Sequence, residues 1–309
     1  MKSLFPGKKQ ITLVIVTCLT IIATSQAQKK NGILPLTGIK YFNEGIEAKN
    51  IDVKIDGAQL MSNRLPLNKE IEVRLQHISG FTADANRTMF AGAEVIVLSP
   101  RGEVLLKDPN ALIRSYANGF TAKDLAAFSI KFGIGADIMK GNFGGTLKIR
   151  LYDMKGKNQL RMEAPVTFGR VGEASQVSKN LRTLKTATGA VGIINGLEAK
   201  DMQVKVDTTI KVAPRMAYTS MDISDIEGSS ISEMFEGKES FWVYDSDMNE
   251  VKITDILLKK VKGALESNTV NYTLKIPYRL KSNTTKLYTV RYRWENPGKS
   301  QLIDVVVTN

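Results

Sequence analysis

The sequence has few of the side chains that enzymes use for nucleophilic and metal chemistry. Its 309 residues include one histidine, His77, and one cysteine, Cys18. A Ser-His-Asp site would have to use His77, and a zinc site with several histidine or cysteine ligands cannot form within one chain. Residues 141–145 are rich in glycine but precede a predicted strand, which is typical of a turn. We therefore expect no enzyme and no cofactor, with glycoside hydrolysis by paired carboxylates left as an alternative.

An apolar run long enough to span a bilayer as a helix, about 20 residues, is also missing. The candidate tract, residues 11–23, is shorter, follows three lysines and precedes Ser25-Gln26-Ala27. This pattern predicts a signal peptide at residues 1–27 that is cleaved after Ala27. The alternative is a lipoprotein anchored at Cys18, although the residues after that cysteine remain apolar.

Cleavage after Ala27 would remove the only cysteine, so the exported chain would have no intramolecular disulfide. Its stability would then come from packing, for which a chain of this length has room in two domains. Exported eukaryotic proteins of this kind more often carry disulfides. We therefore expect export to a bacterial periplasm or cell surface.

A dense run of one charge is absent, although the net charge is +12 at pH 7. Basic residues such as Lys148, Arg150 and Arg291 alternate with apolar ones, which is typical of a solvated sheet face. Contact with anionic headgroups or polysaccharide is the alternative interpretation. The predicted export and the lack of a recognisable motif argue against nucleic acid as a partner.

What the sequence does contain is an internal echo. Residues 45–49 read GIEAK, and residues 196–200 read GLEAK. Three further matches keep the same order: residues 89–94 with 234–239, residues 103–104 with 250–251, and residues 156–160 with 298–302. The spacing drifts from 151 (45 to 196) to 142 (156 to 298), as loop insertions and deletions in a duplicated domain would produce.

A period of two dominates both copies, with Ile71, Val73 and Leu75 alternating with charged residues. We therefore predict an all-β protein of two tandem homologous β-sandwich domains of immunoglobulin-like character. The domains are expected at residues 31–168 and 190–309, the second as an internal repeat of the first. Between them we expect a linker, residues 169–189. Val177, Leu181 and Leu184 fall at helical spacing there and predict a short amphipathic helix.

The most acidic turn, residues 245–250, contains Asp245, Asp247 and Asn249 at a spacing that can wrap a calcium ion. Glu250 stands where a calcium loop needs glycine, and the counterpart turn in the first copy, residues 99–102, is not acidic. A plain hairpin turn is therefore the favoured interpretation, and these three residues remain a weak candidate metal site.

Aromatic residues of the second copy are the remaining ligand candidates, because rings stack on sugar faces. We align Tyr288, Val290 and Tyr292 with Leu147, Ile149 and Leu151, so this column is expected to pack in the core. Trp242, Trp294 and Arg293 are the candidate ligand residues, and Trp294 is expected to be the most exposed. His77 is expected on the inward side of its strand, matched by Asp222 in the second copy, and therefore to be structural.

Together these features predict an exported, non-catalytic binding or structural protein of the bacterial envelope. The expected partner is a protein or polysaccharide of the envelope, and the mature chain is expected to have no transmembrane segment. Edge strands of the sandwiches offer a surface for protein contact. The alternative is a glycan-binding module that uses the aromatic residues of the second copy.

Overall fold

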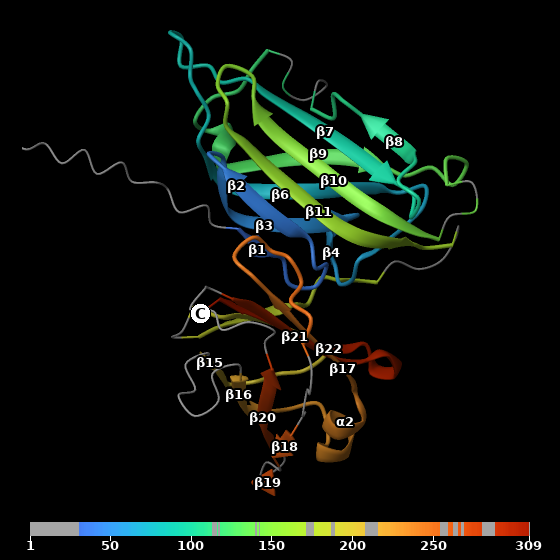
Figure 1. The fold of residues 1–309 in the computed structure, drawn as a ribbon, viewed down its shortest axis with the longest axis vertical. Helices are drawn as coiled ribbons and strands as arrows, with labels where there is room; N and C mark the ends of the chain where they lie inside the picture. The colour runs from blue at the N-terminus through green and yellow to red at the C-terminus, as the bar shows by residue number, and fades with distance from the viewer. Residues whose placement is uncertain are drawn as a thin grey trace, which may run out of the picture.

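The computed structural model describes residues 31–112, 116, 118–139, 141, 143–170, 176–186, 189–207, 216–253, 259–261, 265–266, 269–279 and 288–308. Strands dominate these residues and form two sandwiches, one above the other in Figure 1. The first sandwich comes from the N-terminal half of the chain and the second from the C-terminal half. The signal peptide prediction lies outside the described residues.

The first sandwich has two facing sheets. One contains β1 (Gly32–Ile33), β2 (Lys40–Glu44), β5 (Arg64–Leu65), β7 (Ala91–Leu98), β8 (Val104–Asp108), β10 (Gly144–Asp153) and β11 (Gln159–Phe168). The other contains β3 (Glu47–Ile55), β4 (Ala58–Leu60), β6 (Glu70–Ser79), β9 (Ala127–Gly133) and β12 (Val177–Ser178). Their strand orders are β1-β2-β11-β10-β7-β8, with β5 parallel to β11, and β12-β4-β3-β6-β9.

The second sandwich repeats this plan. One sheet contains β13 (Arg182–Lys185), β14 (Val191–Asn195), β17 (Lys238–Tyr244), β21 (Thr289–Asn296) and β22 (Gln301–Thr308). The other contains β15 (Asp201–Asp207), β16 (Met216–Ile226), β18 (Lys259–Val261), β19 (Leu265–Glu266) and β20 (Thr269–Arg279). Their orders are β13-β14-β22-β21-β17 and β15-β16-β20-β18, with β19 paired to β20.

The two sandwiches share one topology. The order β2-β11-β10-β7 in the first corresponds to β14-β22-β21-β17 in the second, and β3-β6-β9 corresponds to β15-β16-β20. In both, the chain crosses to the opposite sheet after β6 or β16 and again before the last hairpin, which is the arrangement of an immunoglobulin-like sandwich. The predicted fold class, tandem immunoglobulin-like β-sandwiches, is therefore confirmed.

The core of each sandwich follows from the alternation of apolar side chains along its strands. In β6 and β10, the side chains of Ile71, Val73, Leu147 and Leu151 are buried while their neighbours face outward. Full burial of one such side chain stabilises the fold by about 1.5–3 kcal/mol. Each sandwich therefore has its own apolar cluster.

His77 is not on the inward side of its strand, contrary to our expectation. Its φ of 50° lies in the left-handed region, which interrupts the alternation of β6. Leu75 and Ile78 are therefore both buried, whereas His77 is exposed. In the second copy Asp225, with φ 52°, stands in the same way between buried Ile223 and Ile226, so Asp225 and not Asp222 is the counterpart.

The predicted linker helix is wrong. Within residues 169–189 the structure has two short strands, and β12 pairs with β4 of the first sandwich whereas β13 pairs with β14 of the second. Each sandwich offers an open sheet edge whose backbone groups can pair with this segment. A short isolated helix is marginally stable in water, so pairing with the two edges is favoured over the helix. The segment is thus built into both sheets.

The described helices are short: η1 (Asp124–Ala126), α2 (Ile231–Glu236) and η2 (Pro297–Lys299). Helix α2 begins with a capping box in which Ser230 and Glu233 bond each other's backbone N–H groups. Lys299 also pairs with Glu233 and, as the main cause, lowers the pKa of that carboxyl to about 2. Among the described residues, no helix has the length and apolar character needed to cross a membrane.

Candidate functional site: the cleft between the sandwiches

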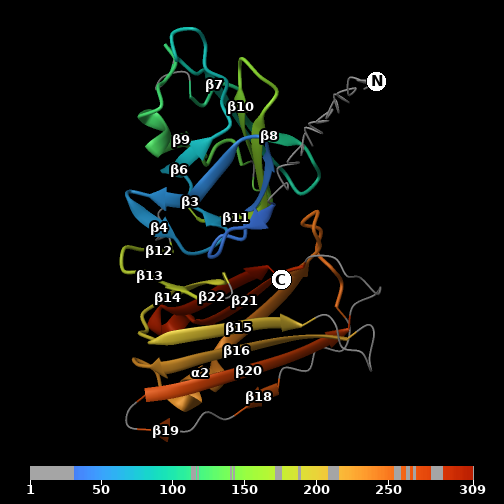
Figure 2. The same ribbon diagram turned by 90° about the vertical axis from the view of Figure 1, so that its left-hand side faces the viewer.

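The sheet that contains β21 and β22 faces the first sandwich (Figure 2). On this outer face a buried ion-pair cluster joins the two sandwiches. Asp304 on β22 is 0% exposed. Its Oδ2 accepts hydrogen bonds from Arg291 Nη2 at 2.7 Å and from Arg293 Nη1 at 3.1 Å. We call Arg291, Arg293 and Asp304 the latch.

The latch holds backbone groups of the first sandwich. Leu36 donates its N–H to Asp304 at 3.2 Å and accepts from Arg291 at 3.1 Å. Arg293 donates to the carbonyl of Met61 at 2.9 Å. Gly38 has a φ of 68°, and a Cβ there would clash with the guanidinium of Arg291, so the loop between β1 and β2 requires glycine at this point. Hydrogen bonds to charged groups are among the strongest in proteins, so the latch fixes the first sandwich on the second.

A small apolar cluster adds to the contact between the sandwiches. Ile33 of the first sandwich packs with Tyr244 and Met248 of the second, and all three side chains are buried. Trp242 lies against this cluster. Burial raises the pKa of Tyr244 to about 12, so its phenol remains protonated at neutral pH.

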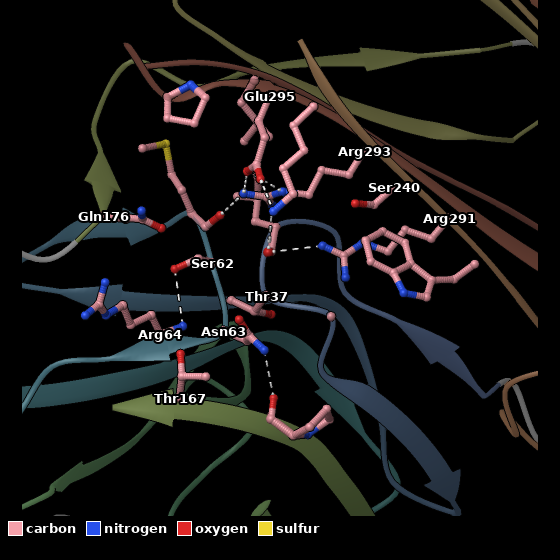
Figure 3. Close-up of a pocket in the computed structure, with 18 of the residues that line it drawn as sticks. Thr37, Ser62, Asn63, Arg64, Thr167, Gln176, Ser240, Arg291, Arg293 and Glu295 are labelled. Carbon is pink, nitrogen blue, oxygen red and sulfur yellow. Dashed lines mark hydrogen bonds and ion pairs between the residues drawn. The ribbon is translucent and has the colours of Figure 1, made fainter. Parts of the chain in front are cut away.

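Beside these contacts lies a cleft of about 550 Å³. Side chains from β17, β21, the turn after β21 and the start of β22 form one wall, and strands β2, β5 and β11 with neighbouring loops of the first sandwich form the other (Figure 3). The polar residues that line it are Thr37, Lys40, Ser62, Asn63, Arg64, Thr167, Gln176, Lys238, Ser240, Glu250, Arg291, Arg293, Glu295, Ser300 and Gln301. A cleft of this volume falls in the range of small-ligand and peptide sites.

The three candidate metal ligands form the tip of a hairpin. Asp245 Oδ1 accepts from the N–H groups of Asp247 and Asn249, both at 2.9 Å. Ser99 caps the matching turn of the first copy with its hydroxyl in the same way. The carboxylate of Asp245 thus serves the turn, which is how an Asx residue stabilises a hairpin. This hairpin turn also places Met248 in contact with the first sandwich.

The expectation that Trp294 is exposed is wrong. Its ring is 0% exposed, and its Nε1 donates to the carbonyl of Met234 at 3.0 Å. A fully buried indole cannot stack on a sugar. Trp242 is half-buried and lines the cleft, with the Arg291 guanidinium 5.0 Å from its ring centre. Arg293, the third candidate, belongs to the latch and also lines the cleft.

The misplacement of Trp294 traces to a register shift between the copies. Asn158 donates to the carbonyl of Gly80 at 2.6 Å, and Gln301 donates to the carbonyl of Gly228 at 2.6 Å. Asn158 and Gln301 are therefore equivalent, whereas the echo aligns Gln159 with Gln301. With this offset the strand pair Leu151–Leu160 corresponds to Trp294–Ile303, so Trp294 takes the place of a core leucine. The predicted core column is buried throughout and extends to Trp294.

Sequence reasoning missed the latch because none of its residues forms a motif. A signal was present: Asp304 is the one charged residue in the strand QLIDVVVT, and an acid in such an apolar run needs a buried partner. Arg293 pairs with Asp304 in the ladder, and Arg291 lies two residues before it. Leu36 and Met61 contribute backbone groups, which a sequence does not reveal.

The fold and the cleft define a class of protein: two immunoglobulin-like sandwiches held together around a polar cleft. No family model and no curated protein matches the chain. Among solved structures, a collagen adhesin from S. aureus aligns at 7% identity over 85% of this chain and 95% of the other, with a TM-score of 0.12. Such a score carries no argument about function.

Proposed function

We propose that this is an exported, non-catalytic binding protein of a bacterial envelope, and that it contacts a partner protein through the cleft between its sandwiches. The single observation that carries the proposal is the cleft itself, which two separate sandwiches line and the latch holds in shape. A preformed site lowers the entropic cost of binding, because neither wall has to be ordered when the partner arrives. Export rests on the pattern of residues 1–27.

A binding role also agrees with the chemistry of the cleft. Among the described residues, its lining has no histidine or cysteine and offers hydroxyls, amides and paired ions. These groups suit recognition better than nucleophilic attack. The alternative, glycan binding, keeps one supporting observation: Trp242 lines the cleft. Arg291 covers part of that ring, which leaves less of it for a sugar.

Capture from envelope extract tests the proposal. We expect the tagged protein to retain a specific protein, and Ser240→Tyr, which fills the cleft, to lose it. Ser79→Tyr is the matched control, because Ser79 is exposed at the end of β6 and does not line the cleft. A glycan array in parallel tests the alternative. Equal capture by Ser240→Tyr and the unchanged protein would refute the role of the cleft.

The predicted export has its own test. Expression in a bacterial host with an export pathway should yield a protein in the periplasm or medium whose first residue is Gln28, as N-terminal sequencing would show. Labelling with a fatty acid that depends on Cys18 would favour the lipoprotein alternative, and an uncleaved chain in the cytoplasm would contradict export.

A further inference from the structure

We propose that the cleft recognises a carboxylate of an acidic peptide segment, an inference that rests on the proposed function of the cleft. Three independent features of the lining support it: an excess of cations, hydroxyl protons without acceptors, and one buried acceptor without a donor.

The first feature is the charge of the lining. Apart from Arg64, four cationic side chains line the cleft, Lys40, Lys238, Arg291 and Arg293, against two carboxylates, Glu250 and Glu295. Asp304 lies behind the wall and brings the number of acids to three, so one positive charge remains in excess. Partly buried charges are screened by salt less than exposed ones, so this excess favours an anionic group in the cleft.

The second feature is a set of hydroxyls on both walls. Thr37, Ser62 and Thr167 come from the first sandwich and Ser240 from the second (Figure 3). Thr37 and Ser62 accept backbone N–H groups. Within the part of the chain that the structure describes, no acceptor receives the hydroxyl protons of these four residues. A carboxylate, which has two acceptor oxygens and no proton, complements such donors.

The third feature is an unpaired acceptor beside the cleft. Gln301 lines the cleft and is 5% exposed, and its Nε2 donates to the carbonyls of Gly196 and Gly228. These two bonds fix the orientation of the amide, and its Oε1 is buried with no hydrogen-bond partner among the described residues. An unsatisfied buried acceptor is costly, and a backbone N–H next to an acidic side chain would satisfy it.

The latch keeps its two arginines fixed in the wall of the cleft. Arg291 and Arg293 are held by Asp304 and by backbone carbonyls, so they contribute fixed charge and do not swing toward a ligand. Lys238, whose Nζ lies 3.7 Å from Glu295, is exposed and can turn to an incoming carboxylate. Lys238 is therefore the residue whose removal should weaken binding without disturbing the fold.

Calorimetry with three synthetic probes tests the inference on the full exported protein. The probes are a hexaglutamate peptide, a hexaglutamine peptide and a hexagalacturonate. We expect hexaglutamate to bind, its affinity to fall as salt rises, and Lys238→Gln to weaken it about two- to fivefold. Lys200→Gln is the control, since Lys200 is exposed in the same sandwich, pairs with Asp225 and does not line the cleft.

Each other outcome overturns the inference. Equal affinity for hexaglutamine would show that the carboxylate is not recognised. Tighter binding of hexagalacturonate would show that the ligand is an acidic glycan and not a peptide. An equal effect of Lys238→Gln and Lys200→Gln would place binding outside the cleft. If hexaglutamate does not bind but Ser240→Tyr still abolishes capture of a partner, the inference fails and the proposed function stands. If Ser240→Tyr has no effect on capture, the proposed function fails as well.

Discussion

At the scale of single residues, the copies differ at a strand position where they meet. Asp304 occupies the position that Arg161 has in the first copy, if Asn158 and Gln301 are taken as equivalent. Arg161 forms an exposed ion pair with Glu44, whereas Asp304 is buried between two arginines. The same strand position therefore serves a solvated surface in one copy and a joint between domains in the other.

Replacing Asp304 tests the strength of this joint. We expect Asp304→Asn to lower the free energy of unfolding by about 3 kcal/mol, because two buried guanidinium groups would lose their counter-ion. Urea unfolding measures the change. Arg161→Gln is the matched control at the equivalent position, and its exposed pair should contribute less than about 1 kcal/mol. A similar loss in both variants would contradict the structural role of the latch.

At the scale of elements, loops and short strands connect the sandwiches. The loop between β1 and β2 places Leu36 and Gly38 on the latch, and β12 and β13 tie the connecting segment to one sheet each. Both Gly38 and Gly57 have a positive φ, but only Gly38 has the Arg291 side chain where a Cβ would stand. A substitution at Gly57 therefore adds backbone strain alone, whereas one at Gly38 adds strain and a steric clash.

Substitution of the two glycines distinguishes these costs. Gly57→Ala should lower stability by about 1 kcal/mol, the cost of a left-handed alanine, since no atom lies within 4 Å of its Cβ. Gly38→Ala should lower stability further, because it also displaces Arg291 from Leu36. Thermal or urea unfolding of both variants gives the difference. Equal losses would mean that the loop yields to the added methyl group.

At the scale of the whole molecule, the latch and the apolar cluster connect the two sandwiches. Both tryptophans lie in the second sandwich, so their fluorescence reports on that half, whereas far-UV circular dichroism reports on both. Because the interface is buried and ion-paired, we expect the two signals to change together.

Weakening the interface should separate the two transitions. Met248→Ser removes a side chain that is 2% exposed between the sandwiches. The loss of a buried methionine costs about 2–5 kcal/mol, enough to let one sandwich unfold before the other. Met154→Ser, at a position 61% exposed, is the control and should keep a single transition. Coincident transitions in Met248→Ser would show that the latch alone couples the halves.

Much of the fold was readable from local pattern. Alternation in residues 70–75 and 147–151 predicted strands and their buried faces, and the echo predicted a second copy of the first fold. The errors have local causes as well. A left-handed residue, His77, reversed the faces of a strand end, and the ladder places Trp294, two residues beyond Tyr292, at the position of the core residue Leu151. Neither a φ angle nor a ladder register is written in side-chain periodicity.

The sequence by itself determined the class of the fold, because apolar alternation and repeated turns act through local geometry, and it shows that histidine and cysteine are scarce. Only the tertiary structure decided where the copies meet and what the acidic turn and Trp242 do there. The joint consists of backbone carbonyls, a buried acid and two arginines from distant parts of the chain. Such contacts depend on how two finished sandwiches pack, so the lone acid in an apolar strand signals a buried partner without saying which groups of the other sandwich it meets.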